Sequence, residues 1–217
     1  MYDATGIHET LKPSLRGVSH QIAFFFALLG AAALVGLAAN RLGSISGAIY
    51  GASLAGMLGA SALYHRPTWS PAALRRMRSV DHAGIFLLIA GTYTPVCLVG
   101  LKGTLGMTLL GVVWLGALLG IGHTLFFAHR FRALNAMLYV LLGCAAVPTV
   151  PWLWEALGAY RTALLLGGGA IYIAGAAVYS KRWPNPAPAH FGYHELFHLM
   201  VIAAAGLHFA AVLDLVA

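Results

Sequence analysis

Charged residues are scarce in this chain. Only 9% of its 217 residues are Asp, Glu, Lys or Arg, whereas an ordinary soluble domain has about 25%. Hydrophobic residues make up 60% of the chain, and its mean hydropathy is +0.80. A soluble protein needs more polar surface than this, and a disordered chain or a nucleic-acid-binding domain needs more charge. The composition therefore predicts a polytopic membrane protein with no nucleic-acid partner.

Cysteine is equally rare, and two motifs common in soluble proteins are missing. The two cysteines, Cys97 and Cys144, lie within apolar stretches, so we interpret them as small packing residues rather than a disulfide. The chain has no heptad repeat and no glycine-rich phosphate loop placed between a strand and a helix. These absences leave the long apolar runs as the main structural signal.

Seven apolar stretches divide the chain, each close to the roughly 20 residues that a membrane-spanning helix needs. They cover residues 19–39, 45–65, 80–100, 104–127, 133–152, 159–180 and 191–216. We therefore predict an all-α fold, a bundle of seven transmembrane helices, in which the fourth and fifth are the least sharply separated. Residues 1–18 form a short N-terminal segment, residues 19–217 form one transmembrane domain, and no second domain fits.

Basic residues are distributed unevenly between alternate loops. One side of the predicted membrane holds Lys12, Arg16, Arg66, Arg75, Arg76, Arg78, Arg130, Arg132, Lys181 and Arg182. The other side holds Arg41, Lys102 and Arg161. Because cytoplasmic loops carry the excess of Lys and Arg, this bias predicts a cytoplasmic N-terminus and an external C-terminus.

Two pairs of glycines have the spacing of close helix contacts. They are Gly47-x-x-x-Gly51 and Gly116-x-x-x-Gly120. We interpret both pairs as packing within one bundle, although the same spacing also occurs where helices dimerise, so a homo-oligomer stays open.

Ionisable residues from distant parts of the sequence fall at one membrane depth. His65 closes the second predicted span, Asp81 opens the third, and His194 and His198 lie in the first turns of the seventh. An ionisable residue within a span is costly and marks a functional site by default. By the predicted orientation, all four residues lie at the cytoplasmic end.

The spacing of the histidines favours a metal site. His194-x-x-x-His198 places two imidazoles on one helix face, which is a common way for a helix to offer two ligands to one ion. This spacing usually means nothing in a soluble helix, whereas imidazoles inside a membrane bundle need partners. His65 would complete a three-histidine set that leaves the fourth position of a zinc ion for water. Ser61 lies one turn before His65, and Asp81 would hold that water or orient a histidine.

The remaining polar residues have simpler interpretations. We expect a packing or interfacial role for His82, and we expect Glu195 to face away from the histidine pair toward the headgroups or a basic loop. His208 lies about 15 Å deeper than His198 by helical rise, too deep for the same metal. We expect Asp214 to be solvated near the outer end.

Three motifs occur in a recognisable order along the chain. They are Ser61-Ala-Leu-Tyr-His65, Asp81-His-Ala-Gly-Ile-Phe-Leu-Leu-Ile-Ala-Gly-Thr-Tyr-Thr-Pro95 and His194-Glu-Leu-Phe-His198. Together with the opening Lys12-Pro-Ser-Leu-Arg-Gly-Val-Ser-His20, they resemble the hemolysin III family, the bacterial branch of the progestin and adipoQ receptor (PAQR) family. The resemblance covers residues 12–215 and is specific because all three motifs are present in order.

The resemblance implies a seven-helix bundle in the inner (plasma) membrane with an intramembrane zinc ion near the cytoplasmic face. It implies that His65, His194 and His198 bind Zn²⁺, that Asp81 holds the zinc-bound water, and that Ser61 lies beside the site. The wider superfamily includes alkaline ceramidases, which implies hydrolysis of a lipid amide. The chain lacks the long cytoplasmic N-terminal region of the animal adiponectin receptors, so a hormone-receptor role does not carry over.

We therefore expect a zinc-dependent intramembrane hydrolase that cleaves a lipid amide or ester and acts in membrane lipid homeostasis. Asp81 would be the general base and Ser61 a hydrogen-bond donor to the oxyanion, with a fatty-acyl chain between the helices. Whether catalysis occurs stays open, because a non-enzymatic lipid or membrane-state sensor would use the same zinc structurally. A transporter has weaker support, and a cytolysin has little, because we find neither an amphipathic β pattern nor a secretion signal.

Overall fold

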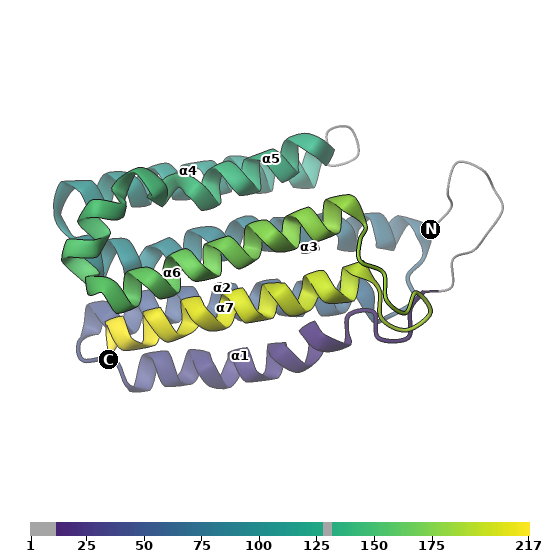
Figure 1. Cartoon of the computed structure of the whole chain (residues 1–217), viewed down its shortest axis with the longest axis horizontal. Coiled ribbons are helices and arrows are strands. Elements are labelled where there is room, and N and C mark those ends of the chain that lie inside the picture. Colours follow the sequence, from purple (N-terminus) through teal and green to yellow (C-terminus); the bar gives the residue numbers. More distant parts are fainter. Residues whose placement is uncertain (1–11, 128–131) are drawn as a thin grey trace.

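The structure of the protein is a computed structural model that describes residues 12–127 and 132–217. Its elements are α1 (Val18–Gly36), α2 (Arg41–His65), α3 (Pro71–Pro95), the π-helical η1 (Val96–Leu101), α4 (Gly103–Phe127), α5 (Arg132–Gly143), the 3₁₀-helical η2 (Cys144–Thr149), α6 (Val150–Lys181) and α7 (Tyr193–Val216). The long helices run side by side along one axis (Figure 1). The prediction of an all-α fold is confirmed over these residues, and both cysteines are free.

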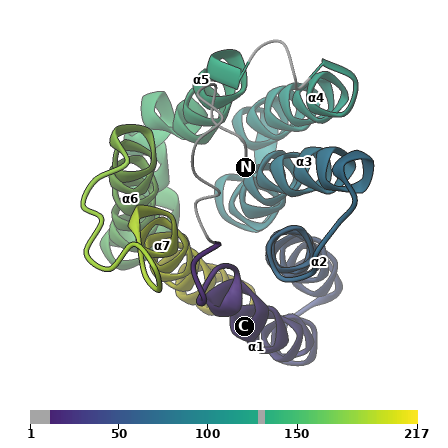
Figure 2. The same ribbon diagram turned by 90° about the vertical axis from the view of Figure 1, so that its right-hand side faces the viewer.

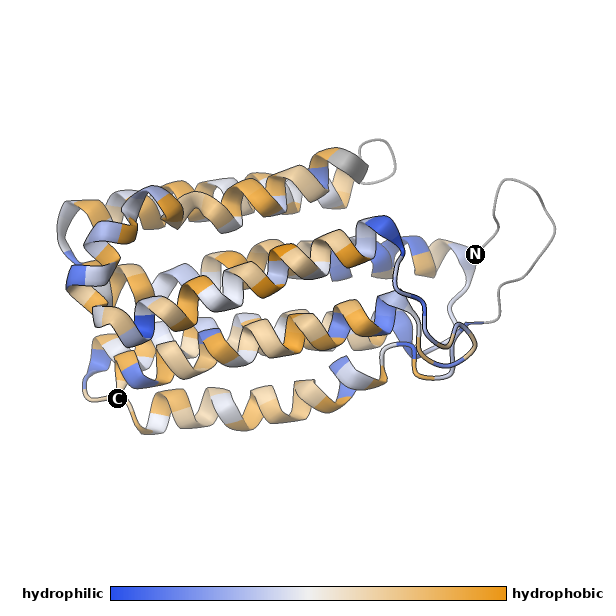
Figure 3. Cartoon of the chain, in the orientation of Figure 1, coloured by the Kyte–Doolittle hydropathy of each residue, from blue (hydrophilic) through white to orange (hydrophobic). Residues whose placement is uncertain are grey.

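Six segments are long and apolar enough to cross a membrane. Five of them overlap one predicted span each. The other runs over 48 residues, from Leu134 to Lys181, and includes most of α5, η2 and α6. Apolar residues fill the middle of the bundle and hydrophilic residues gather at its ends (Figure 3). The prediction of a multi-pass membrane protein is confirmed, and the count of seven spans stays a prediction.

The third helix begins earlier than its apolar stretch. The sequence predicts a span from residue 80, whereas α3 begins at Pro71. The Ser70 side chain caps the helix by accepting a hydrogen bond from the Ala73 amide at 3.4 Å, and Pro71 suits the first helical turn because it has no amide to leave unbonded. The residues Arg75, Arg76 and Arg78 therefore lie on the first turns of α3 and not in a loop.

The chain between α5 and α6 leaves regular α-helical geometry within the bundle. The α-helix α5 ends at Gly143, and η2 follows with Pro148 inside it. The hydroxyl of Tyr93 on α3 donates to the Gly143 carbonyl at 2.9 Å and accepts from the Ala146 amide at 2.9 Å. Backbone groups freed in a membrane need such partners, so Tyr93 compensates for the break.

A second break interrupts α6 itself. Gly158 has φ 77° and ψ 168°, a conformation that glycine adopts readily and other residues avoid. The Thr162 hydroxyl donates to the Leu153 carbonyl across this point at 3.2 Å. The predicted sixth span, which starts at residue 159, therefore begins where the straight part of α6 begins.

Seen along its axis, the bundle is a ring in which α7 packs against α6 and also contacts α1 and α2 (Figure 2). Small residues permit the close contacts. A Cβ atom on Gly51 would lie 2.6 Å from the Cβ of Ala31 on α1, and one on Gly116 would lie 2.7 Å from Leu142 on α5. The prediction that these glycines pack helices within one bundle is confirmed.

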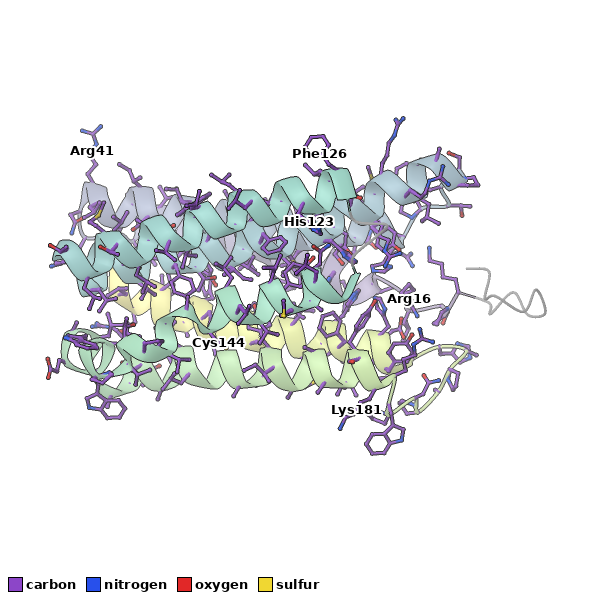
Figure 4. All side chains as sticks on the ribbon, turned by 90° about the horizontal axis from the view of Figure 1, so that it is seen from above. Arg16, Arg41, His123, Phe126, Cys144 and Lys181 are labelled. Atoms are coloured by element: carbon purple, nitrogen blue, oxygen red, sulfur yellow. The ribbon has the colours of Figure 1, made fainter. Side chains whose placement is uncertain are left out.

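One end of the bundle collects the N-terminal segment 12–17, the α2–α3 loop 66–70 and the loop 182–192 before α7 (Figure 1). We call it the polar end. Arg16 and Lys181 lie at this end, whereas Arg41 lies at the opposite end (Figure 4). Residues 1–11 of the predicted N-terminal segment, and Arg130 of the predicted fourth loop, lie outside the described residues.

Candidate metal centre

Two helices bring three histidines together at the polar end. His65 is the last residue of α2, and His194 and His198 lie one turn apart in the first two turns of α7. Each of the three offers one ring nitrogen, and these nitrogens all lie within 4.8 Å of one another. The structure thus places together the three residues that the sequence predicts as zinc ligands.

The geometry of this set fits a metal ion. The Nε2 atoms of His65 and His194 are 3.2 Å apart, and two ligands of a tetrahedral zinc with Zn–N bonds of about 2.0–2.1 Å would be about 3.3 Å apart. His65 is 7% exposed and His198 is 2% exposed, and the buried Nδ1 of His198 makes no hydrogen bond within the described residues. A buried imidazole nitrogen without a partner is costly in a protein interior, and a bound cation would satisfy this histidine set.

The candidate catalytic pair, Asp81 and Ser61, lies beside the set and not within it. Asp81 comes from α3 and is partly buried, and Ser61 is 2% exposed on α2. The Ser61 side chain lies close to the Asp81 carboxyl. Asp81 is not part of the group of residues that share a common ligand position in the described chain.

A fourth imidazole, for which the sequence predicts no role, adjoins the set. His20 is the third residue of α1 and is 3% exposed. Its Nδ1 lies 2.8 Å from the Ser61 hydroxyl oxygen, and its ring stacks on His198 with centroids 3.8 Å apart and planes 8° from parallel. The only signal for it in the sequence was its place in the opening motif, because its spacing relates it to no other histidine.

A buried ion pair links the segment before α1 to the start of α7. The Arg16 guanidinium pairs with the Glu195 carboxylate, which is only 3% exposed. The second carboxylate oxygen of Glu195 accepts a hydrogen bond from the Gly192 amide at 2.8 Å. Glu195 therefore meets a basic segment, as predicted, and also caps the helix that carries His194 and His198.

Residues 12–17, which we call the N-terminal strap, lie across the polar end. The amides of Ser14 and Leu15 donate to carbonyls of the loop before α7 at 3.2 and 3.3 Å. The Lys12 ammonium donates to the Arg66 carbonyl at 3.0 Å. Partial burial lowers the pKa of Lys12 below its ordinary value, and the nearby charges of Arg66 and Arg16 lower it further. The strap thus ties the end of α2 to the loop before α7.

The strap also contacts a candidate ligand directly. Gly17 has φ 78°, and a Cβ atom placed on it would lie 2.6 Å from the Cβ of His65. Only glycine fits this combination of positive φ and close approach.

Two other predicted polar residues lie away from the set. His208 is bonded through Nε2 to the Leu165 carbonyl of α6 at 3.0 Å, and its ring meets Tyr172. Asp214 is 51% exposed, as predicted, and also pairs with Arg161 at 2.7 Å. Both contacts join α6 to α7 at a distance from the polar end.

Comparison with known proteins identifies the family. Residues 8–209 match the sequence profile described as Haemolysin-III related. The chain belongs to the haemolysin III family. Hemolysin-3 of Bacillus cereus is 34% identical over 165 residues, 76% of this chain and 72% of that protein. The Hemolysin-3 homolog of Bacillus subtilis (strain 168) is 34% identical over 208 residues, 94% of each chain.

The haemolysin III match extends to animal proteins at lower identity. The human monocyte to macrophage differentiation factor is 24% identical over 198 residues, 89% of this chain and 80% of that protein. The progestin and adipoQ receptor-like protein 1 of Caenorhabditis elegans is 28% identical over 155 residues, 63% of this chain and 35% of that protein. The resemblance that the three motifs carry is thus confirmed over most of the chain.

Proposed function

We propose that this haemolysin III family protein is a zinc-dependent intramembrane hydrolase of a lipid amide or ester, acting in membrane lipid homeostasis. The observation that supports this most is the juxtaposition at the polar end of three clustered histidines and the Ser61–Asp81 pair. His65, His194 and His198 would hold the ion. A zinc ion held by three histidines polarises a carbonyl oxygen and acidifies water.

Asp81 is the proposed general base and acid. Its carboxylate would take a proton from the attacking water while the water oxygen bonds to the substrate carbonyl carbon. The carboxylic acid would then return that proton to the leaving nitrogen or oxygen as the bond between it and the carbonyl carbon breaks. Asp81 can do both steps because it lies outside the histidine set, and its carboxyl is not needed as a ligand.

The contacts of Ser61 refine its proposed role. A serine hydroxyl has one proton, and an ionised carboxylate only accepts hydrogen bonds. A Ser61 proton directed to Asp81 would leave the Ser61 oxygen to accept from Nδ1 of His20, which lies 2.8 Å away. We accordingly propose that Ser61 holds the Asp81 carboxylate in place, in preference to donating to the oxyanion.

An apolar groove near the histidines supports a lipid substrate. A cavity of about 200 Å³ lies between the start of α1 and the start of α7, lined by Leu15, Val18, Ser19, Ile22, Phe191, Glu195 and Leu199. Ser19 and Leu199 are the chain neighbours of His20 and His198. A fatty-acyl chain lying in this groove would run between α1 and α7, the helices that carry His20 and His198.

A non-enzymatic sensor of lipids or of membrane state is the second candidate. The clustered histidines come from α2 and α7, and His20 adds α1. A metal ion at this point would fix the relative positions of these helices without any chemistry. The two functions differ in whether Asp81 is needed for more than stability.

We further propose seven spans with the polar end in the cytoplasm, in the inner (plasma) membrane. The chain enters α1 at the polar end and leaves α7 at the opposite end (Figure 1), which supports an odd number of passes. In that figure α5 and α6 run in opposite directions, which supports two passes within the 48-residue segment. The oligomeric state stays open.

Release of free fatty acid tests the hydrolase directly. Purified protein is stripped with a chelator, reloaded with Zn²⁺, and incubated with a panel of ceramides and phospholipids in mixed micelles. We expect release from at least one lipid class by the zinc-loaded protein, and loss of at least 100-fold of that rate both in the stripped sample and in Asp81→Asn. Zinc binding without release from any lipid on the panel would contradict the hydrolase and favour the sensor.

A further inference from the structure

His20 is buried and makes two kinds of contact at the centre, although no motif assigns it a role there. It is 3% exposed, it stacks flat on His198, and its Nδ1 meets the Ser61 oxygen. Its Nε2 is buried and makes no hydrogen bond within the described residues. A histidine that only filled space would not place one nitrogen on Ser61 and its ring face on His198.

The hydrogen bonds define how the His20 ring acts. With its proton directed to Asp81, as proposed above, the Ser61 oxygen would accept from Nδ1 of His20, which lies 2.8 Å away. The proposed chain of donors then runs from His20 to Ser61 to Asp81. One side chain of α1 thus orients a side chain of α2, and through it the carboxyl of α3.

The stack defines a second, separate action. The rings of His20 and His198 are 8° from parallel with centroids 3.8 Å apart, so rotation of the His198 ring about its own bonds would collide with His20. His20 is not among the residues that share a common ligand position in the described chain. His20 therefore restricts the rotation of the His198 ring without itself being one of the proposed ligands.

We propose that His20 is a positioning residue of the metal centre, whose ring face orients the ligand His198 and whose Nδ1 orients Ser61 and Asp81. This inference rests on the proposed metal centre. The N-terminal end of α1 is then a working part of the centre, beside α2, α3 and α7. Residues that orient ligands typically change metal affinity or activity by about 10–100-fold when they are removed.

Two substitutions separate the two actions. His20→Phe keeps a flat ring against His198 and removes the donor to Ser61. His20→Asn keeps an amide donor near the position of Nδ1 and removes most of the ring. The matched control is His190→Phe, because His190 also lies at the polar end and its Nδ1 contacts a serine, Ser14, at 2.9 Å, but this pair is exposed.

The readouts are the Zn²⁺ dissociation constant from chelator competition and the visible d–d absorption of the Co²⁺-substituted protein, both in detergent. We expect His20→Asn to weaken Zn²⁺ binding by about 10–100-fold, because His198 is released. We expect His20→Phe to bind Zn²⁺ within about threefold of the native protein, but with a changed Co²⁺ spectrum, because Ser61 and Asp81 are released. His190→Phe should match the native protein in both.

The possible results distinguish the positioning role of His20 from the proposed metal centre on which it depends. A native protein that binds no Zn²⁺ overturns the metal centre itself. A native protein that binds Zn²⁺, with both His20 variants matching it in affinity and spectrum, overturns the positioning role alone. Loss of Zn²⁺ from His20→Phe as complete as from His65→Ala would make His20 a ligand and would also overturn it. Elution as a single folded species during size exclusion is required of each variant.

Discussion

The histidines of the centre differ in how far their positions follow from spacing. His194 and His198 are one turn apart, and the helix alone puts them on one face. His65 is 129 residues from His194. Both lie at the same end of their predicted spans, so their common depth in the predicted membrane indicated that they lie close together. His20 lies at that depth as well, but its contact with His198 depends on α1 packing beside α7. Hydrophobic periodicity does not encode which helices are neighbours, so His20 was missed.

The difference between ligand and neighbour gives a residue-scale prediction. Replacing His65, His194 or His198 by alanine removes one of the three proposed ligands, so zinc per protein should fall to near zero. Asp81→Asn keeps the size of the side chain and lies outside the histidine set. Its zinc content should stay close to the native value at saturating metal, with affinity reduced by no more than about 10–100-fold. Inductively coupled plasma mass spectrometry of purified variants measures this.

His208→Ala is the control for this series. His208 contacts the Leu165 carbonyl and the Tyr172 ring, away from the three clustered histidines. Its loss should leave the zinc content unchanged even where stability falls. Loss of zinc from Asp81→Asn as complete as from the histidine variants would make Asp81 a direct ligand, and the proposed hydrolase would lose its base.

At the scale of the elements, the apolar runs of the sequence indicate where the helices lie, but they do not predict the residues at which the helices begin and end. The α3 helix starts at Pro71 because Ser70 caps it, and capping depends on one side chain that a hydropathy average does not register. The break between α5 and α6 contains Pro148, which the sequence shows, whereas the partner that makes the break tolerable, Tyr93, lies on another helix. Local chemistry therefore predicted where helices stop, and tertiary contacts explain why they can stop there.

The N-terminal strap gives an element-scale prediction. Arg16→Met keeps the length of the side chain but leaves the Glu195 carboxylate buried without its cation. Breaking a buried pair from one side costs about 3–5 kcal/mol, so the unfolding midpoint in detergent should fall clearly. The double variant Arg16→Met with Glu195→Gln removes both charges and keeps an acceptor for the Gly192 amide. It should recover most of that stability in the same thermal unfolding measurement.

The second ion pair of the described chain supplies a matched control. Arg161 and Asp214 pair at 2.7 Å near the opposite end, with side chains 33% and 51% exposed. Exposed pairs contribute about 0–1 kcal/mol, so Asp214→Asn should move the midpoint little. An Arg16→Met midpoint as close to the native value as that of Asp214→Asn would show that the strap does not hold α7.

At the scale of the whole molecule, the composition predicts a membrane protein but does not predict how its helices are arranged. A chain with 9% charged residues has few alternatives to a membrane bundle. The ring of helices in Figure 2, with α7 closing it against α1 and α2, was not predicted, because every face of these helices is apolar enough to pack or to meet lipid. The order of the helices around the ring therefore comes only from the structure.

Orientation in the membrane is the last whole-molecule property, and the basic residues predict it. Arg16 and Lys181 lie at the polar end and Arg41 lies at the opposite end (Figure 4). The positions of these three residues agree with the two sides to which the sequence assigns them. A reporter inserted in the α2–α3 loop, residues 66–70, should read as cytoplasmic, and one fused after Ala217 should read as external. Alkaline phosphatase, active only outside, and a fluorescent protein that matures only in the cytoplasm give opposite readouts at each position.

A third reporter is fused after Lys102, between η1 and α4 at the end opposite the strap. It controls for reporters that change the orientation of the chain. Its readout should be the same as that of the fusion after Ala217. The three sites separate the count of spans from the orientation. Readouts exchanged at every site would keep seven spans and turn the bundle over, which would place the histidines at the outer face. Agreement between the 66–70 loop and Ala217 would require an even number of passes between the strap and the C-terminus. The segment from Leu134 to Lys181 would then cross the membrane once, and the antiparallel course of α5 and α6 could not persist in the bilayer.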